Sequence, residues 1–468
     1  MKRKLENQVY DTALFPTEWR FSAAIVGLIR YFEYHHISYQ KDCKWEGWEG
    51  IAYNEKDLTE ARFLEFAESW YGASFPHKKA EQLLKQGCSR GNTWTEEQIK
   101  EINDSLKGNT ILKKIVKVKF DGSNQEEILA VLEENRETIM KETFRNKPNM
   151  YAGFANSNLL FTEENPNCRL LGYNVDKGRK TRSLSYGFHK DAFQATDIRE
   201  FDWIPFAFCD TYESFFVNNN LDIHTLCHTA DNLKEIMEQS REHRESDRTV
   251  LLKSMAKIEG LVEFDVEVIS KRRDREYFES LYIRKEALKA MKKLPDLALL
   301  DFRYKLGEGY WLNVQEEVLD CCINQMSLDS LIEQLLKLKE REQIGYLQVV
   351  IGQLIYLSVE WSEQMDKELK KRTMRSAENY ARETVRVLLD RKKKNKIQSY
   401  RQKLISAITF HDYDRVNEIL LQLSSYAEIK YPFIYYLLED GEENKEVALA
   451  FAHALEAYEK ESKEEKEA

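Results

Sequence analysis

A dense block of basic residues in the last quarter of the sequence carries the clearest chemistry. Residues 367–403 contain 14 Lys or Arg and four Asp or Glu, so the block has a net charge of +10 in a chain whose formal net charge is −10. Like charges repel one another unless an anion lies against them, and a solvated helix surface usually mixes both signs. The block therefore predicts contact with a phosphate backbone. The residues expected to make it are Lys371, Arg372, Arg375, Lys392, Lys393, Lys394, Lys396 and Arg401.

Two smaller basic groups lie earlier in the chain. A predicted hairpin has Gly178 at its tip, and its cations are Lys177, Arg179, Lys180 and Arg182. Such a tip can enter a groove or straddle phosphates, although a solubilising surface turn has the same composition. The second group, Lys271, Arg272 and Arg273, leaves the end of a predicted strand. Nearby acids can pair with these cations, so the sequence supports a structural role and phosphate binding equally.

Asparagine side chains form a third group. Asn218, Asn219 and Asn220 follow a phenylalanine-rich run, and a further Asn-rich loop contains Arg145, Lys147 and Asn149. Asn amides read adenine edges and bind phosphate oxygens. Asn is also a common turn residue because it tolerates left-handed backbone and bonds its own main chain. Both interpretations stay open for the three consecutive asparagines.

Signals for catalysis are weak. Asp265 and Glu267 are two apart on a predicted strand and could share a metal ion, and His224 and His228 flank Cys227 on a predicted helix. Neither set has the further ligands that a metal site needs. The sequence has no GxxxxGK[ST], GxGxxG or GxSxG pattern. We therefore expect no enzyme activity, no catalytic residues, no metal and no cofactor.

Composition and periodicity place these residues on an expected fold. Seven scattered cysteines and the lack of a run of 18 apolar residues or a signal-peptide pattern predict a cytoplasmic protein without a membrane segment. Residues 17–35 have helical periodicity, 201–217 predict a core hairpin, and 111–120 and 261–270 alternate like strands. After Pro295 helical periodicity dominates. The prediction is an α+β N-terminal region, residues 1–300, followed by an all-α C-terminal helical bundle, residues 301–468.

Two stretches resemble a known family. The first is Trp19 followed by Ala23, Ala24 and Ile-Val-Gly-Leu-x-Arg ending at Arg30; the second is Pro205–Phe208 followed by Glu213–Asn220. Together they cover under a tenth of the chain, and they resemble the large subunit of CRISPR type I Cascade surveillance complexes, with type I-B as the most similar branch. Members of that branch often carry paired Cys-x-x-Cys motifs that bind zinc. This sequence has none, so no zinc site is carried over.

The resemblance implies a non-catalytic subunit in antiviral defence. Its N-terminal domain would sit at the base of the complex and recognise the duplex motif that flanks the target (the PAM), and its small-subunit-like helical domain would stabilise the R-loop. The implied partners are guide CRISPR RNA, target double-stranded DNA, the backbone and 5′-handle-binding proteins, small subunits and a recruited helicase-nuclease, with no membrane. Type I-B systems can also make a small subunit from within the large-subunit gene, which makes Met326 a candidate internal start beside its alternative as a core methionine. The competing hypotheses are a metal-dependent nuclease and a helical scaffold without a nucleic-acid role.

Overall fold

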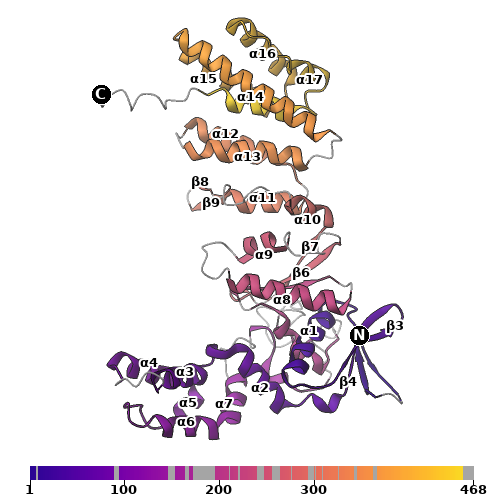
Figure 1. The fold of residues 1–468 in the computed structure, drawn as a ribbon, viewed down its shortest axis with the longest axis vertical. Helices are drawn as coiled ribbons and strands as arrows, with labels where there is room; N and C mark the ends of the chain where they lie inside the picture. Colours follow the sequence, from indigo (N-terminus) through magenta and orange to yellow (C-terminus); the bar gives the residue numbers. More distant parts are fainter. Residues whose placement is uncertain are drawn as a thin grey trace, which may run out of the picture. The chain divides into compact units, whose positions relative to one another are not determined.

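The structure is a computed structural model of the 468-residue chain. It describes residues 1–6, 9–88, 94–145, 153–163, 168–171, 196–209, 211–219, 222–239, 247–255, 264–275, 277–292, 300, 302–307, 309–324, 326–341, 345–361 and 366–456. The chain divides into two compact units, Met1–Ile283 and Arg284–Ala468 (Figure 1). The sequence placed this boundary near residue 300, and the α+β and helical characters of the two parts are confirmed.

The first unit combines short antiparallel sheets with helices. Its elements are β1 (Lys2–Lys4), β2 (Thr12–Leu14), α1 (Trp19–Tyr34), β3 (Gln40–Trp45), β4 (Trp48–Tyr53), η1 (Glu55–Asp57), α2 (Glu60–Tyr71), η2 (Gly72–Ser74), α3 (Pro76–Cys88), α4 (Glu96–Leu106), α5 (Thr110–Ile115), α6 (Gln125–Glu134), α7 (Arg136–Arg145), η4 (Ser157–Leu159), η6 (Arg199–Ala207), β5 (Glu213–Asn218), α8 (Ile223–Gln239), α9 (Asp247–Met255), β6 (Val266–Arg272) and β7 (Glu279–Ile283). One sheet has the strand order β1-β2-β4-β3 and the other β5-β6-β7.

Helix α1 is the centre of this unit. It is buried along almost its whole length because apolar and small residues occupy most of its positions. Tyr31 of α1 packs edge-on against Trp203 of η6, with ring centroids 5.3 Å apart, and Phe63 of α2 lies at the same centroid distance from Trp203. Aromatic pairs in this arrangement add to the energy of apolar burial. The aromatic cluster therefore fixes η6, and β5 after it, against α1.

The segment before β5 differs from its prediction. Residues 201–208 were expected to form one strand of a hairpin, but Arg199–Ala207 is a 3₁₀ helix. Pro205 within it has no N–H to donate to a strand ladder, and β5 pairs instead with β6, with Phe216 opposite Ile269. Residues 111–120 were also expected to be a strand. Their first half is the helix α5, which begins at Thr110 and is capped by the side chain of Asn109.

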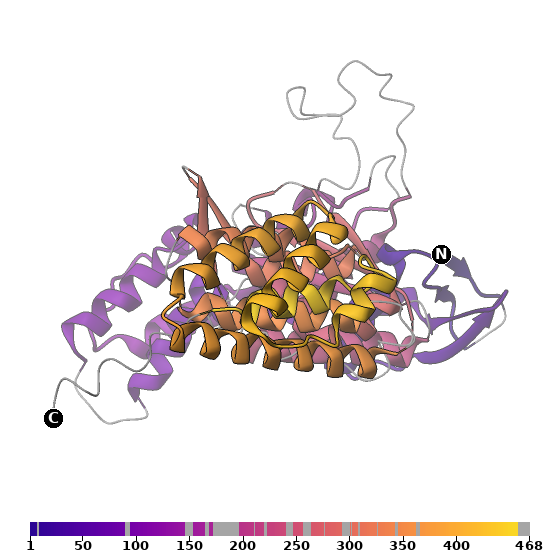
Figure 2. The ribbon, with the colours of Figure 1, turned by 90° about the horizontal axis from the view of Figure 1, so that it is seen from above.

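The second unit is helical apart from one hairpin. Its elements are α10 (Lys285–Lys292), β8 (Arg303–Gly307), β9 (Tyr310–Asn313), α11 (Val314–Ile323), α12 (Asp329–Arg341), α13 (Gly345–Trp361), α14 (Lys367–Asp390), α15 (Lys394–Thr409), α16 (Tyr413–Ala427), α17 (Ile434–Glu439) and α18 (Lys445–Ala454). The expected all-α bundle therefore gains the two-stranded sheet β8-β9. Figure 2 shows several of the orange and yellow helices running roughly parallel to one another.

One apolar core joins the elements of the second unit. Val314 and Val318 of α11, Ile351 of α13 and Phe451 of α18 belong to a single buried cluster. Helix α14 packs on α18 and contributes Met374 and Leu388 to the same core. Because α14 lies at the edge of this core, its other face remains in solvent.

Candidate nucleic-acid interface

Helix α14 presents two opposite faces. The side chain of Asp366 caps its start by accepting a hydrogen bond from the N–H of Leu369 (2.9 Å). Its buried residues follow three- and four-residue steps and are Lys370, Thr373, Met374, Ala377, Ala381, Thr384, Val385 and Leu388. This spacing holds them on one face of a helix. The helix is therefore anchored by a continuous buried face that is mostly apolar.

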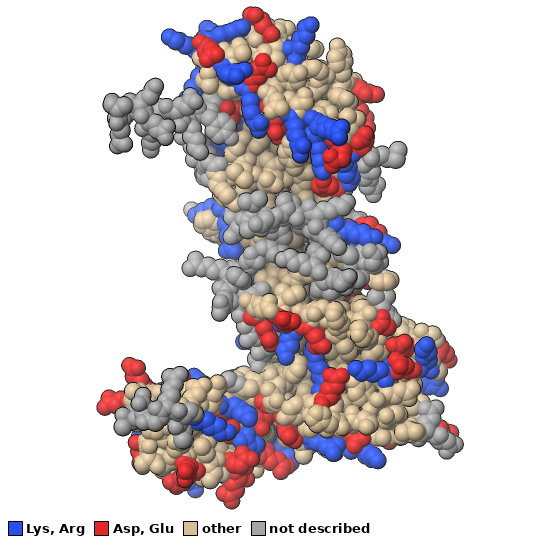
Figure 3. Space-filling model, viewed as in Figure 1, with Lys and Arg blue, Asp and Glu red and all other residues tan. Residues whose placement is uncertain are grey.

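The opposite face carries a row of arginines. Arg372, Arg375, Arg382 and Arg386 are exposed, and they are separated by steps of three, seven and four residues. At 3.6 residues per turn these positions share one face, and the row from Arg372 to Arg386 is about 21 Å long at 1.5 Å per residue. We call these four residues the arginine row. Figure 3 shows Lys and Arg side chains interspersed with Asp and Glu side chains on the visible face of the helical unit.

The arginine row is poorly neutralised. Arg382 lies 3.5 Å from Glu378, a weak pairing at the edge of hydrogen-bond distance. Within the described residues, Arg372 and Arg386 form no ion pair. An exposed ion pair contributes little in any case, typically about 0–1 kcal/mol. The positive charge of the row is therefore available to an external anion.

A basic turn continues the row into α15. Lys392, Lys393, Lys394 and Lys396 are all exposed. The chain reverses here because Lys392 adopts left-handed backbone, with φ 57°, and the N–H groups of Lys392 and Lys393 donate to the carbonyls of Leu389 and Leu388, both at 2.8 Å. This is a Schellman-type helix end. The structure thus places the four lysines that were predicted to contact phosphate at this turn and in the first turn of α15, and the contact itself stays a prediction.

Two residues predicted to bind phosphate have other surroundings. The carboxylates of Glu360 and Glu368 pair with Lys371 and raise its pKa. Arg401 of α15 points inward and is only 9% exposed. Arg382 and Arg386 were in the basic block but were not singled out from the sequence. The signal that identifies them is their helical spacing from Arg372 and Arg375.

Asn218 and Asn219 lie inside the first unit. Asn218 is 2% and Asn219 5% exposed. The amide of Asn218 donates to Glu267 Oε2 (2.9 Å), and that of Asn219 donates to Thr229 Oγ1 (3.1 Å). The structure thus favours a structural role for these two residues, because neither side chain faces solvent where a base could bind. Asn220 is outside the described residues.

The basic group after β6 is largely satisfied within the protein. Lys271 is buried, and its ammonium donates to the carbonyl of Arg275 (2.7 Å). Arg272 forms an ion pair with Asp274 at 3.0 Å. The N–H of Arg273 donates to the carbonyl of Tyr212 (3.1 Å). The pairing with a nearby acid that the sequence left open is therefore what the structure shows for Arg272, whereas the printed partner of Lys271 is a backbone carbonyl.

Other predicted binding residues fall where the structure gives no side chain. The hairpin tip with Lys177, Arg179, Lys180 and Arg182 lies outside the described residues, as do Lys147 and Asn149. Arg145 is the last residue of α7, and its side chain is likewise not described. Their nucleic-acid contacts stay predictions from the sequence.

The candidate metal ligands contact other side chains of the first unit. Asp265 accepts a hydrogen bond from Tyr282 (3.1 Å), while Glu267 accepts from Asn218 and from Ser280 (3.2 Å). His224 and His228 stack with ring centroids 6.2 Å apart. Among the described residues, no group of three or more His, Cys, Asp or Glu could hold a metal ion.

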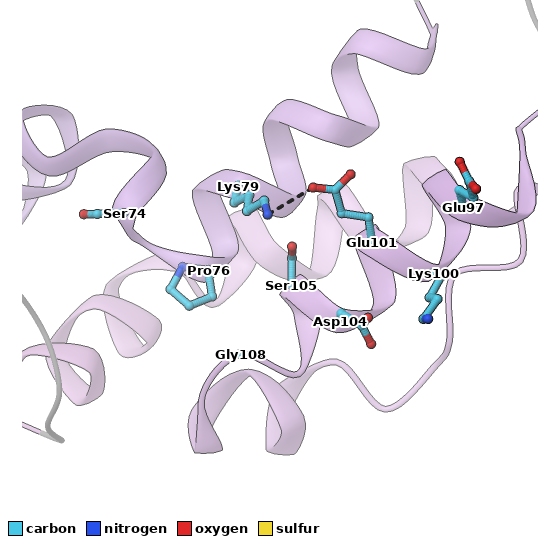
Figure 4. A pocket seen from close by; sticks show the side chains of 9 residues that line it. All are labelled: Ser74, Pro76, Lys79, Glu97, Lys100, Glu101, Asp104, Ser105 and Gly108. Carbon is cyan, nitrogen blue, oxygen red and sulfur yellow. Dashed lines mark ion pairs between the residues drawn. The ribbon is translucent and has the colours of Figure 1, made fainter. Parts of the chain in front are cut away.

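A pocket of about 520 Å³ lies between α3 and α4 (Figure 4). Charges of both signs line it, and Lys79 and Glu101 neutralise each other at 3.0 Å. The lining residues are Ser74, Pro76, Lys79, Glu97, Lys100, Glu101, Asp104, Ser105 and Gly108. Its acids outnumber its lysines, so the pocket is less suited to a phosphate than the arginine row is.

Comparison with known proteins gives one match. The sequence model of the family described as CRISPR-associated protein Csx8 matches residues 10–249 and 231–455. No curated protein and no solved structure matches the chain. No helix among the described residues is both long and apolar enough to cross a bilayer.

Proposed function

Because the chain belongs to the CRISPR-associated protein Csx8 family, we propose that it is a non-catalytic, nucleic-acid-binding large subunit of a type I, Cascade-like surveillance complex. The observation that carries the proposal is the arginine row on α14. Four exposed arginines share one helix face, and the lysines of the turn after α14 extend the charge. A stacked strand advances about 3.4 Å per nucleotide, so a row of about 21 Å spans about six phosphates.

The proposed ligand of this face is single-stranded DNA displaced or held in the R-loop. Arginine suits this role because its guanidinium is always charged and pairs with phosphate oxygens through two N–H groups. A row of cations without base-reading side chains binds backbone irrespective of sequence. The guide CRISPR RNA would then select the target sequence, and the helical unit would hold the strand.

The proposed partners follow from the family. They are guide CRISPR RNA, target double-stranded DNA, the backbone and 5′-handle-binding proteins, small subunits and a recruited helicase-nuclease that cuts the DNA. Recognition of the target-flanking motif is assigned to the first unit, in particular to the predicted hairpin tip. Assignment to type I-B rests on the two sequence stretches alone.

The test replaces three arginines of the row by glutamine: Arg372→Gln, Arg382→Gln and Arg386→Gln together. Each lost phosphate contact reduces the slope of log K against log salt by about 0.7 on a single strand, so the triple variant should lose about two units of slope. The matched control changes three exposed cations elsewhere in the helical unit, Lys337, Arg415 and Lys430, and should bind like the wild type. Fluorescence anisotropy with a labelled single strand measures both.

Two outcomes would favour the competing hypotheses. Cleavage of the strand by the purified protein with Mg²⁺ or Mn²⁺ would support the nuclease, and its loss in Asp265→Asn and Glu267→Gln variants would locate the site. Absence of any salt-dependent binding, by the protein alone and in its assembled complex, would support a scaffold role and contradict the proposal.

A further inference from the structure

Arg401 is a buried cation for which the described residues provide no ion-pair partner. It is 9% exposed, and its Nε and Nη2 atoms are buried without a hydrogen-bond partner. No described carboxylate forms an ion pair with it. Arginine does not release its proton in a protein, so burial cannot be relieved by neutralisation. Buried charges are normally paired, because leaving one unpaired costs several kcal/mol as an order of magnitude.

Helix α12, which packs against α15, contributes a second buried cation to this region. Lys339 of α12 is 9% exposed and forms an ion pair with Glu456. Burial lowers the pKa of Lys339, and the charge of Arg401 lowers it further against the opposing effect of Glu456. Among the described residues, the carboxylate of Glu456 pairs with Lys339. No described carboxylate is left to pair with Arg401.

His453 of α18 shares this environment. Its Nδ1 is buried and unpaired, and its backbone carbonyl accepts a hydrogen bond from Gln348 of α13 (3.1 Å). Burial lowers the pKa of His453 to about 3, with the charges of Lys339, Arg401 and Arg382 adding to the effect. The imidazole is therefore neutral at physiological pH and offers a ring nitrogen rather than a further charge.

We propose that Arg401 and Lys339 form a phosphate-binding site within the helical unit, at the junction of α12, α15 and α18. The guanidinium supplies a fork of N–H donors and Lys339 a point charge, which together match the several oxygens of a phosphate. Arg382 of the arginine row lies on α14, which packs against α18, the helix that carries His453. The phosphate can be free or part of a nucleic acid; only the second source rests on the proposed function.

The decisive variant is Arg401→Met, which keeps the aliphatic bulk and removes the charge. Replacing an unpaired buried charge by an apolar side chain is often neutral or stabilising. In chloride buffer we therefore expect a melting temperature equal to or above that of the wild type. Millimolar phosphate should raise the wild-type melting temperature by about 2–4 °C through preferential binding to the folded state, and should leave the variant unchanged.

The control variant is Arg415→Met, which removes an exposed arginine paired with Glu418 at 2.5 Å and should retain the phosphate response. Acetate at equal ionic strength should give no shift. The general stabilising effect of phosphate on protein surfaces acts on all variants alike, so the difference between them isolates the site. Hydrogen exchange of peptides from α15 and α18 should slow with phosphate in the wild type only.

Each result separates the hypotheses. A phosphate response confined to proteins that retain Arg401 supports the site, and a response to a single-stranded oligonucleotide but not to inorganic phosphate, again dependent on Arg401, supports it with a polymeric source. An equal response in the Arg401→Met variant, an equal response to acetate, or no response to either phosphate source overturns it. If the arginine-row variant loses strand binding but keeps the phosphate response, the Arg401 site binds phosphate independently of the arginine row.

Discussion

Arg30 of α1 donates a hydrogen bond from Nη1 to the backbone carbonyl of Phe206 in η6, at 2.6 Å. The same guanidinium pairs with Asp231 of α8 and lies 5.0 Å from the ring centroid of Trp70. Arg30 and Phe206 belong to the two sequence stretches that indicated the family. These stretches lie far apart in the sequence but form one packing unit, so their residue types reflect the interior of the first unit rather than a ligand surface.

Gly27 is expected to be essential to this packing. A Cβ atom at Gly27 would clash with the backbone carbonyl of Trp203, and backbone cannot move aside as a flexible side chain can. We predict that Gly27→Ala lowers the free energy of unfolding by about 1–3 kcal/mol, as other overpacked cores do. Urea denaturation followed by tryptophan fluorescence measures the change.

Gly153 provides the control for that substitution. It is exposed, and a Cβ atom there meets no atom within 4 Å. Gly153→Ala should change the stability by less than about 0.5 kcal/mol. If the two substitutions have equal effects, the close approach of α1 and η6 is not what Gly27 provides.

A glycine substitution at Lys392 should affect strand binding and protein stability in opposite directions. Its left-handed backbone, with φ 57°, costs an L-residue about 1–2 kcal/mol, whereas glycine adopts it freely but is more flexible when unfolded. Lys392→Gly should therefore leave the stability unchanged or raise it by up to about 1 kcal/mol. It should still weaken strand binding, with a loss of about 0.7 in salt slope if the ammonium contacts phosphate.

Lys393 is the matched comparison because it follows Lys392 and has an ordinary φ of −109°. Lys393→Gly should lose binding to a similar extent without any gain in stability. A stabilisation of the same size in both variants would contradict the backbone explanation. Unchanged binding in both would remove this turn from the proposed interface.

The hairpin tip is predicted to engage the duplex that flanks the target. Replacing Lys177, Arg179, Lys180 and Arg182 by alanine should weaken target-DNA binding by the assembled complex and leave assembly on guide RNA intact. Electrophoretic mobility shifts with matched and altered flanks distinguish the roles. If the loss of target-DNA binding is the same for every flanking sequence, the tip contacts the DNA backbone without reading the motif. If assembly on guide RNA is lost to the same extent, the variant is misfolded.

Met326 is predicted to be an internal translation start. The residue is 53% exposed, so the alternative of a core methionine is not what the structure shows. Met326→Leu should leave the stability of the full-length protein unchanged and abolish a smaller C-terminal polypeptide on immunoblots of expressing cells. A smaller band that persists after the substitution, or is absent from the wild type, would contradict the start site.

The structure adds a condition to that prediction. Leu312, Val314, Val318 and Cys321 precede Met326 but belong to the same core as α12–α18. A fragment beginning at residue 284 should therefore unfold cooperatively and at higher urea than one beginning at residue 326, as circular dichroism would show. Equal midpoints would mean that α11 and the β8-β9 hairpin contribute little to the helical core.

The division into an α+β part and a helical part can be read from local sequence patterns. Helical periodicity is a local property, and α14 follows it because it buries one face. Helix α1 shows the same periodicity, although almost all of its residues are buried. The concentration of cations between residues 367 and 403 is likewise readable from composition. The steps of three, seven and four residues between the arginines of the row are also present in the sequence. Arg382 and Arg386 can be recognised as members of the row only when the bounds and the buried face of α14 are known.

Which polar residues face solvent depends on long-range packing and is visible in the three-dimensional structure alone. Asn218, Lys271 and Arg401 look like surface ligands in the sequence, because residue type gives chemistry but not burial. Asn218 is satisfied by Glu267 and Lys271 by the carbonyl of Arg275, groups contributed by other segments of the chain. Arg401 lies on α15, which packs against α12 and α18, helices from separate segments of the chain. Such surroundings arise from long-range packing, which no local pattern encodes.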